Sequence, residues 1–94
     1  MSLDAIGCNH RSTPLDSLER MTVAPEELAK ALADLGSAEN LSEVVVLSTC
    51  NRVEIYALAE RFHGGYHDVR EFLCRHAGLP PEDVADHLYA LHDI

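Results

Sequence analysis

The sequence predicts an α+β fold, with a four-stranded, mainly antiparallel sheet and helices on one of its faces. Two observations predict it. Strand-like and helix-like segments alternate along the chain, and the two middle strand-like segments are separated by a connection short enough for a hairpin. The length of 94 residues fits one small domain, and an apolar share of 47% is typical of a globular chain. We therefore expect a single domain over residues 1–94.

The first part of the chain predicts a strand, a loop and a helix. Residues 3–8 are mostly apolar and predict the first strand. Residues 9–21 contain asparagine, proline and aspartate, which favour turns, and they predict an ordered loop. Pro25 suits the first helical position and Gly36 the end of a helix, so they bound the first helix. Its core-facing stripe is Leu28, Ala31, Leu32 and Leu35.

The middle of the chain predicts a hairpin. Residues 43–47 form a β-branched apolar run, which predicts a strand buried on both faces. Residues 53–60 alternate between apolar and polar positions, which predicts a second strand with one more polar face. The connection between the two strands, residues 48–52, is Ser-Thr-Cys-Asn-Arg, in which Asn51 is suited to the geometry of a turn.

The last third of the chain predicts a helix, a helical turn and a strand. The pair Gly64-Gly65 predicts a break before the second helix, and Gly78 predicts its end. Residues 82–86 predict one more helical turn, and residues 87–92 alternate as the last strand. The resulting β-α-β-β-α-β order is that of a ferredoxin-like split β-α-β sandwich.

The charge balance limits the kind of partner. Sixteen acidic and seven basic side chains give a formal net charge of −9. With one lysine, Lys30, the chain lacks the cationic surface that phosphate backbones require, so we do not expect it to bind the body of a nucleic acid by itself. No apolar run approaches the roughly 20 residues of a membrane span, and Met1 is not followed by the basic stretch and apolar core of a signal peptide. These observations predict a cytoplasmic protein that does not bind membranes.

The cysteine pattern argues against a disulfide scaffold. Three cysteines are an odd number, and no C-x-x-C pair is present, so we expect neither disulfides nor a zinc ribbon. Cys8 continues the apolar pattern of the first strand, and Cys74 lies beside Leu73 on the second helix. We expect both cysteines to be small core residues.

Cys50 has a functional interpretation. It lies in a connection rather than on a core face, where it would be accessible, and Arg52 would stabilise its thiolate as a nucleophile. The alternative is a free cysteine in a tight turn, with Arg52 paired to Glu54 or Glu43.

Polar residues near Cys50 extend this interpretation. Ser48, Thr49 and the amides of the turn are candidate donors to a carbonyl under attack. His10 follows the first strand and precedes Arg11, a pairing suited to orienting an anionic substrate or moving protons. The alternative for His10 is a solvated end of a loop.

The other histidines do not predict a metal site. His63 and His67 would align on a helix, but the two glycines between them argue against that helix. His87 and His92 fall on opposite sides of the predicted last strand. We therefore expect structural or surface histidines and no metal ion.

Two separated motifs resemble glutamyl-tRNA reductase. Residues 48–56, STCNRVEIY, are similar to that family's S-T-C-N-R-x-E-x-Y signature, and residues 7–14, GCNHRSTP, look like its G-x-N-H-R-x-A-P segment. Thr13 replaces the usual alanine, and Val53 stands where threonine is common. The resemblance covers essentially the whole chain, but only the N-terminal catalytic domain of the family.

The resemblance implies a reaction and roles for residues. The family converts the glutamyl ester of tRNA to glutamate-1-semialdehyde with NADPH, at the start of tetrapyrrole (porphyrin) biosynthesis. It implies that Cys50 is the nucleophile that forms a thioester, that Arg52 binds the carboxylate of the substrate and that Thr49 holds the glutamyl group. Supporting roles at this site fall to Ser48, Asn51 and His10.

The resemblance also implies parts outside this sequence. NADPH would bind a Rossmann domain, and no G-x-G-x-x-G is present here. The family's further catalytic residues fall beyond Ile94, and a C-terminal domain would form a homodimer that passes its aldehyde to an aminomutase. Residues 1–94 would then be the glutamate-recognition and catalytic domain, inactive in reduction alone. The alternatives are a non-catalytic ferredoxin-like binding or regulatory module, or a thiol redox sensor at Cys50.

Overall fold

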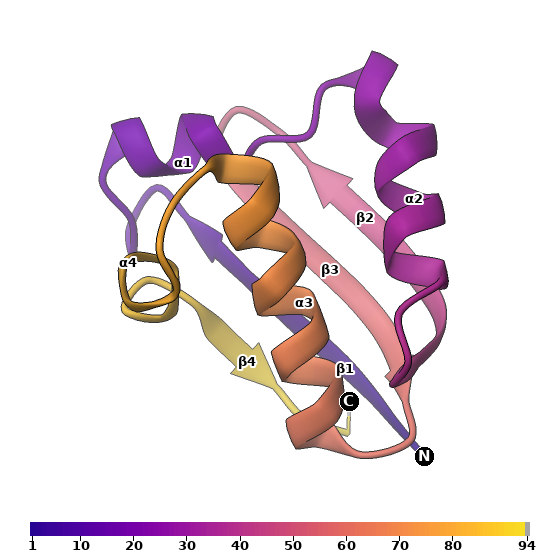
Figure 1. Cartoon of the computed structure of the whole chain (residues 1–94). Coiled ribbons are helices and arrows are strands. Elements are labelled where there is room, and N and C mark those ends of the chain that lie inside the picture. The colour runs from indigo at the N-terminus through magenta and orange to yellow at the C-terminus, as the bar shows by residue number, and fades with distance from the viewer. Residues whose placement is uncertain (94) are drawn as a thin grey trace.

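The computed structural model of the chain describes residues 1–93 (Figure 1). The strands are β1 (Ser2–Asn9), β2 (Leu41–Ser48), β3 (Arg52–Ala59) and β4 (Tyr89–Leu91). The helices are α1 (Leu15–Met21), α2 (Leu28–Gly36), α3 (Phe62–Ala77) and α4 (Pro81–Ala85), and a short 3-10 helix, η1 (Pro25–Glu27), leads into α2.

The four strands form one open sheet in the order β2-β3-β1-β4, and every neighbouring pair is antiparallel. Helices α2 and α3 lie across the same face of this sheet (Figure 1). The N-terminal strand β1 lies between β3 and β4, so it pairs with two strands from the second half of the chain. The predicted α+β class, with an antiparallel sheet and helices on one face, is confirmed.

The core lies between the sheet and these helices. On the central strands, Ile6 pairs with Ile55 and Cys8 with Val53, and all four side chains are fully buried. Burying a large aliphatic side chain contributes about 1.5–3 kcal/mol. The helices cover them with buried side chains of their own: Leu18 and Met21 from α1, Ala31 and Leu35 from α2, and Val69 and Leu73 from α3.

The prediction of a loop over residues 9–21 is partly wrong. Residues 10–14 are a turn, but α1 begins directly after Pro14 and carries Asp16 in its first turn and Arg20 in its last. Both charges complement the helix dipole. Leu18 and Met21 lie three positions apart on its buried side, which is a helical spacing too short to stand out in the sequence.

The prediction that the first hairpin strand is buried on both faces is wrong. β2 is an edge strand, and its residues alternate between the two faces. Val44 and Val46 pack against the core, whereas Val45 points to the opposite face and is 62% exposed. The apolar run at residues 43–47 is therefore an edge strand with apolar side chains on both faces, and the face away from the helices is exposed to solvent.

Gly64 and Gly65 do not break the chain. Both lie inside α3, which begins at Phe62. A Cβ at Gly65 would lie 2.6 Å from the Cβ of Ala59, and one at Gly64 would lie 2.7 Å from Cγ of Asn40. The glycines thus allow α3 to approach β3 and the loop before β2 closely.

The other predicted boundaries are largely confirmed. Helix α2 ends at Gly36, and α3 ends before Gly78, which has a φ of 68° and caps the helix in the left-handed conformation. The predicted helical turn is α4. The last strand is shorter than predicted, because only residues 89–91 pair with β1.

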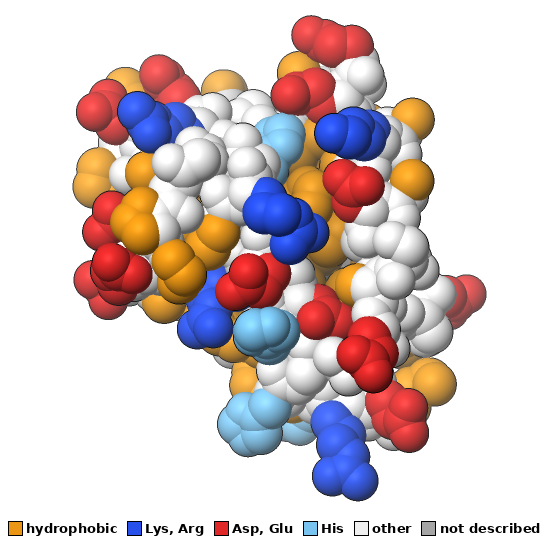
Figure 2. All heavy atoms as spheres, in the orientation of Figure 1, with side chains coloured by type: hydrophobic (Ala, Val, Ile, Leu, Met, Phe, Trp, Pro, Cys, Tyr) orange, Lys and Arg blue, Asp and Glu red, His pale blue; other side chains and the backbone are white. Residues whose placement is uncertain are grey.

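Charged side chains are spread over the helix-covered face. Figure 2 shows the basic side chains of this face scattered among acidic and neutral ones rather than gathered in one patch. This distribution agrees with the net charge of −9 and offers no cationic track for a nucleic acid on that face.

Among residues 1–93, no helix combines the length and the apolar character that crossing a bilayer requires.

Candidate active site

The structure brings the two sequence motifs together at one end of the sheet. The end of β1 pairs with the start of β3, with Asn9 opposite Arg52. One step further, the backbone N–H of His10 donates to the carbonyl oxygen of Asn51 at 2.9 Å. The segments at residues 7–14 and 48–56 therefore lie side by side, although residues 15–47 separate them in the chain.

The hairpin tip between β2 and β3 is held by Thr49. Its backbone N–H donates to the carbonyl oxygen of Arg52 at 2.8 Å, and its Oγ1 accepts from the amides of Asn51 and Arg52, each at 3.2 Å. Asn51 does not supply a left-handed turn, because Asp93 alone among the described non-glycine residues has a positive φ. The backbone and the hydroxyl of Thr49 together thus order the tip, and Cys50 and Asn51 occupy its two outermost positions.

Cys50 differs from the other two cysteines in its exposure. Its side chain is exposed, whereas Cys8 and Cys74 are buried, as predicted. Burial raises the pKa of the Cys8 thiol and of the Cys74 thiol, and Glu71 raises the latter further. Within residues 1–93, the Cys50 thiol has no hydrogen-bond partner, so an incoming group has direct access to it.

Arg52 belongs to a polar cluster that we call the Glu54 cluster: Arg52, Glu54, Tyr56 and Tyr89. Nε of Arg52 lies 3.8 Å from Oε1 of Glu54, an ion pair that was one of the two alternatives predicted for Arg52. The hydroxyl of Tyr56 donates to Oε1 at 2.9 Å, and the hydroxyl of Tyr89 donates to Oε2 at 2.5 Å. The bond to Glu54 raises the pKa of Tyr56, and burial together with the same carboxylate raises that of Tyr89.

Sequence reasoning did not find this cluster. Glu54 and Tyr56 lie two positions apart on one strand, and this spacing was a signal that they share a face. Tyr89 had no such signal, because its approach to Glu54 depends on the pairing of β4 with β1.

Some of the groups predicted to donate hydrogen bonds to a substrate carbonyl already have hydrogen-bond partners within the chain. Oγ of Ser48 accepts from the backbone N–H of Val23 at 2.9 Å, which ties the hairpin to the segment after α1. The amides of Asn51 and Arg52 point to Thr49. Among the described bonds of the tip, the N–H of Cys50 is the amide that remains free.

His10 lies on an ordered loop beside the tip. Oδ1 of Asn9 accepts from the amides of Arg11 and Ser12, at 2.9 and 3.1 Å, and folds the loop back on itself. The His10 side chain is exposed, and its tie to the hairpin is made through its backbone. The structure thus brings His10 next to Asn51, in a position open to solvent.

The remaining histidines are surface residues or have structural contacts. His63 and His67 do lie on one helix, α3, so the argument against their alignment is wrong. His87 and His92 lie just outside β4, and Nδ1 of His87 is 3.1 Å from the carbonyl oxygen of Ser12. In the described part of the chain, no three His, Cys, Asp or Glu side chains are arranged to hold a metal ion.

His92 belongs to the surroundings of a buried carboxylate, Asp4. Its Nδ1 lies 2.8 Å from Oδ1 of Asp4, and the backbone N–H of Asp93 donates to the same oxygen at 3.1 Å. The hydroxyl of Ser2 donates to Oδ2 at 2.9 Å. Burial raises the pKa of Asp4, but these hydrogen bonds outweigh it and lower the pKa below its usual value.

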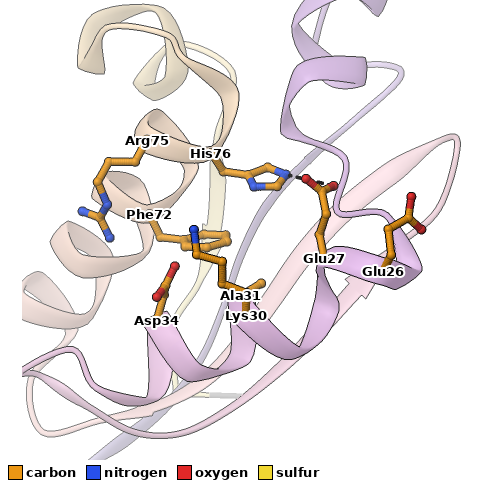
Figure 3. Close-up of a pocket in the computed structure, with 8 residues that line it drawn as sticks. All are labelled: Glu26, Glu27, Lys30, Ala31, Asp34, Phe72, Arg75 and His76. Carbon is orange, nitrogen blue, oxygen red and sulfur yellow. Dashed lines mark ion pairs between the residues drawn. The ribbon is translucent and has the colours of Figure 1, made fainter.

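A separate groove of about 360 Å³ lies between α2 and α3 (Figure 3). Its floor is Phe72, which stacks on His76, and carboxylates and two basic side chains line its walls. None of the predicted site residues lines it. The hairpin tip and the groove are therefore separate features.

The comparisons with known proteins cover the whole chain. The sequence profile of the glutamyl-tRNA(Glu) reductase N-terminal domain matches residues 6–94. The chain is 48% identical over 93 residues to a glutamyl-tRNA reductase of Frankia casuarinae, 46% to one of Salinispora arenicola and 40%, over 92 residues, to one of a Synechococcus species. These alignments include 98–99% of this chain but only 20–21% of each relative. The chain spans about a fifth of the length of the curated relatives it matches.

Proposed function

The chain belongs to the glutamyl-tRNA reductase family as its N-terminal domain, and we propose that it supplies the nucleophile and the glutamate-recognition site of that enzyme. The proposed overall reaction is the NADPH-dependent reduction of glutamyl-tRNA to glutamate-1-semialdehyde, the first step of tetrapyrrole (porphyrin) biosynthesis. The observation that carries the proposal is the exposed Cys50 at the tip of an ordered hairpin, two residues from Arg52. Reduction is proposed for the whole protein, with residues 1–94 as its glutamate-recognition and catalytic domain.

Cys50 is the proposed nucleophile. Its thiolate attacks the carbonyl carbon of the glutamyl ester, a C–S bond forms, and the ester C–O bond breaks. The terminal ribose oxygen of the tRNA leaves with the electron pair of that bond and takes a proton from solvent, which received the thiol proton, and the glutamyl group remains as a thioester on Cys50. The free N–H of Cys50 is the tip amide available to the carbonyl oxygen during this attack.

Arg52 and Thr49 are the proposed substrate-binding residues. The guanidinium of Arg52 is half exposed beside the tip, and its planar donors match a carboxylate bidentately. Oγ1 of Thr49 accepts hydrogen bonds from two backbone amides. It also donates to the carbonyl oxygen of Arg52, and this bond is long, at 3.5 Å between the two oxygens. The proton of this long bond is free to turn to the glutamyl group. We assign supporting roles to Ser48, Asn51 and His10, which surround the tip.

The described residues do not fit NADPH. The lining of the groove between α2 and α3 is acidic on balance, because its carboxylates outnumber its two cations, and it would repel the diphosphate of a dinucleotide; the carboxylates are Glu26, Glu27 and Asp34, and the cations are Lys30 and Arg75 (Figure 3). The chain also has no glycine-rich phosphate loop. We therefore assign NADPH to another part of the reductase and derive no hydride-transfer step from these residues.

The proposal extends to location and partners. Free thiols, among them an exposed Cys50, suit a reducing compartment, and we propose the cytoplasm. The acidic surface supports a contact limited to the aminoacyl end of the tRNA. Membership of the family supports a homodimer formed through a C-terminal domain and an aminomutase that takes the aldehyde.

Acylation of Cys50 tests the proposal. The full-length reductase that contains this chain is incubated with labelled glutamyl-tRNA without NADPH, and its intact mass and digested peptides are searched for a glutamyl adduct. We expect the adduct on Cys50 in the parent enzyme and in Cys74→Ser, a matched control at a buried thiol. Cys50→Ser should form no adduct and lose turnover. Normal turnover in Cys50→Ser would show that the nucleophile is wrongly assigned and would favour the redox-sensor or binding-module alternatives.

A further inference from the structure

Arg11 is an exposed arginine that has no role in the proposed function. It lies in the turn after β1 and directly follows His10, whose backbone N–H donates to the carbonyl oxygen of Asn51 at 2.9 Å. Because Asn51 follows Cys50 in the chain, this bond places the backbone of the turn beside the candidate nucleophile. Arg11 therefore supplies a permanent positive charge at the edge of the candidate active site.

The turn that carries Arg11 is held by hydrogen bonds on both sides. Oδ1 of Asn9 accepts from the backbone N–H of Arg11 at 2.9 Å. On the other side, Oγ of Ser12 lies 3.2 Å from the carbonyl oxygen of His87, and Nδ1 of His87 lies 3.1 Å from the carbonyl oxygen of Ser12. These bonds fix the backbone of the turn and leave the side chain of Arg11 exposed.

The guanidinium of Arg11 has no ionic partner within residues 1–93. The ion pairs of this part of the chain involve Arg52, His76 and His92. The chain has a net charge of −9, yet this cation is not paired with any of its carboxylates. Its donors are therefore available to an anion from outside the chain.

The proposed substrate brings an anion close to this position. The ester that Cys50 is proposed to attack joins the glutamyl group to the ribose of the terminal adenosine, and the same ribose carries a phosphodiester on its 5′ oxygen. This phosphate is one ribose away from the ester, and a guanidinium matches phosphate oxygens with two parallel hydrogen bonds. Arg52 is already assigned to the side-chain carboxylate of the substrate, which leaves Arg11 for the phosphate.

We propose that Arg11 binds the phosphodiester of the terminal nucleotide of glutamyl-tRNA and is a positioning residue that orients the ester toward Cys50. The inference rests on the proposed function and deepens it, since it assigns a contact to the nucleotide rather than to the glutamyl group. Contacts with phosphates fix the register and orientation of a nucleic acid. One such contact needs a single cation, so it is compatible with an acidic domain that lacks a basic surface.

The first test uses the full-length reductase and two small esters. One is adenosine with a glutamyl ester on its 3′ oxygen, and the other carries in addition a methyl phosphate on its 5′ oxygen, which has the single negative charge of a phosphodiester. Acylation of Cys50 without NADPH is followed by intact mass for the parent enzyme, Arg11→Gln, Arg11→Lys and Arg61→Gln. Arg61 is the matched control, because it is also exposed and without an ion pair among the described residues, and it follows β3 at the end of the sheet away from the hairpin tip.

The readout is the second-order rate constant of acylation. We expect the parent to prefer the phosphorylated ester about fivefold, the upper end for one exposed ion pair, and we expect Arg11→Lys and Arg61→Gln to keep this preference. Arg11→Gln should lose the preference and still react with the unphosphorylated ester at the parent rate. A merely structural role of Arg11 would slow both esters equally. Equal rates for both esters in the parent, or a preference that survives in Arg11→Gln, would overturn the inference.

The salt dependence with glutamyl-tRNA is a second measurement. On a single-stranded end, each phosphate contact contributes about −0.7 to the slope of log affinity against log salt concentration. The affinity is taken from the tRNA concentration that gives half-maximal acylation of Cys50. We expect the slope of Arg11→Gln to be shallower than that of the parent by about 0.7, with an unchanged maximal rate, and the slope of Arg61→Gln to equal the parent slope. If neither small ester acylates the parent, this slope decides, and equal slopes for Arg11→Gln and the parent overturn the inference.

The parent enzyme separates this inference from the proposed function. No adduct on Cys50 of the parent with glutamyl-tRNA would overturn the proposed function and the inference together. A normal parent adduct, with the same ester preference and the same salt slope in Arg11→Gln, would leave the proposed function intact and overturn the role of Arg11.

Discussion

Replacing Gly7 with alanine tests how closely β1 and β3 are paired under the candidate site. The new Cβ would lie 2.3 Å from the carbonyl oxygen of Val53 and 2.9 Å from Cα of Glu54. Both are backbone atoms of the neighbouring strand, so the clash cannot be relieved by turning a side chain. β1 has neighbours on both sides, β3 and β4, and has no free direction in which to move within the sheet.

The cost follows from this geometry. Overpacking a well-packed site costs about 1–3 kcal/mol, and a clash of a central strand with the backbone of its neighbour β3 belongs at the upper end. For a domain of this size, a loss of 1 kcal/mol lowers the midpoint of thermal unfolding by about 4–8 °C. We therefore expect Gly7→Ala to unfold about 10–20 °C below the parent chain.

The assay is thermal and urea unfolding of the 94-residue chain, followed by circular dichroism. Gly36→Ala is the matched control, because nothing lies within 4 Å of a Cβ at that position, at the end of α2. There the same substitution should be neutral or stabilise by about 0.4–1 kcal/mol, through the unfolded state. A Gly7→Ala chain as stable as Gly36→Ala would refute the close pairing of β1 and β3.

Two further predictions concern titratable groups. The pKa of Asp4 is lower in the folded chain than its unfolded value of about 3.9, so its carboxylate stabilises the fold above that pH and the contribution is lost as the pH falls through the folded pKa. Asp4→Asn should lower stability at pH 7 and reduce the loss of stability below about pH 4 in urea titrations; an unchanged acid profile would contradict this. In the folded chain, iodoacetamide should modify the exposed Cys50 well before the buried Cys8 and Cys74, whose pKa values are raised, and in urea the three should react alike. Faster labelling of either buried cysteine in the folded chain would argue against the structure of the tip.

Helix ends with local chemistry were predictable from the sequence. Pro25 and Gly36 bound the helical segment that η1 and α2 form, because a proline fits the first turn and a glycine fits the end, although the α-helix itself begins only at Leu28. Gly78 ends α3 in a left-handed conformation that glycine adopts without strain. These positions depend on residues near in the chain, and the structure agrees with the prediction.

Features that depend on distant contacts were not predictable in the same way. The run around Val45 is equally apolar in a central strand and at the edge of an open sheet, and the position of β2 follows from pairing with β3 alone. Gly64-Gly65 signals a break by composition, yet these residues lie inside α3, at positions where Asn40 and Ala59 leave no room for a side chain.

In the candidate site, too, the features set by neighbouring residues were predictable from the sequence and those set by distant pairing were not. The exposure of Cys50 and the burial of the other cysteines follow from local pattern, and the structure agrees. The Glu54 cluster depends on Tyr89, which pairs opposite Gly7 from the other end of the chain. No spacing within one segment of the sequence predicts that contact.

The sheet face opposite the helices also affects how the isolated chain behaves in solution. Val45 and Leu91 are 62% and 54% exposed on that face, which favours contact between copies, while the net charge of −9 drives copies apart. Salt screens the repulsion, since the Debye length falls from about 10 Å at 0.1 M to about 3 Å at 1 M. We therefore expect copies of the chain to self-associate more readily as the ionic strength rises and a low-salt buffer to favour the monomer.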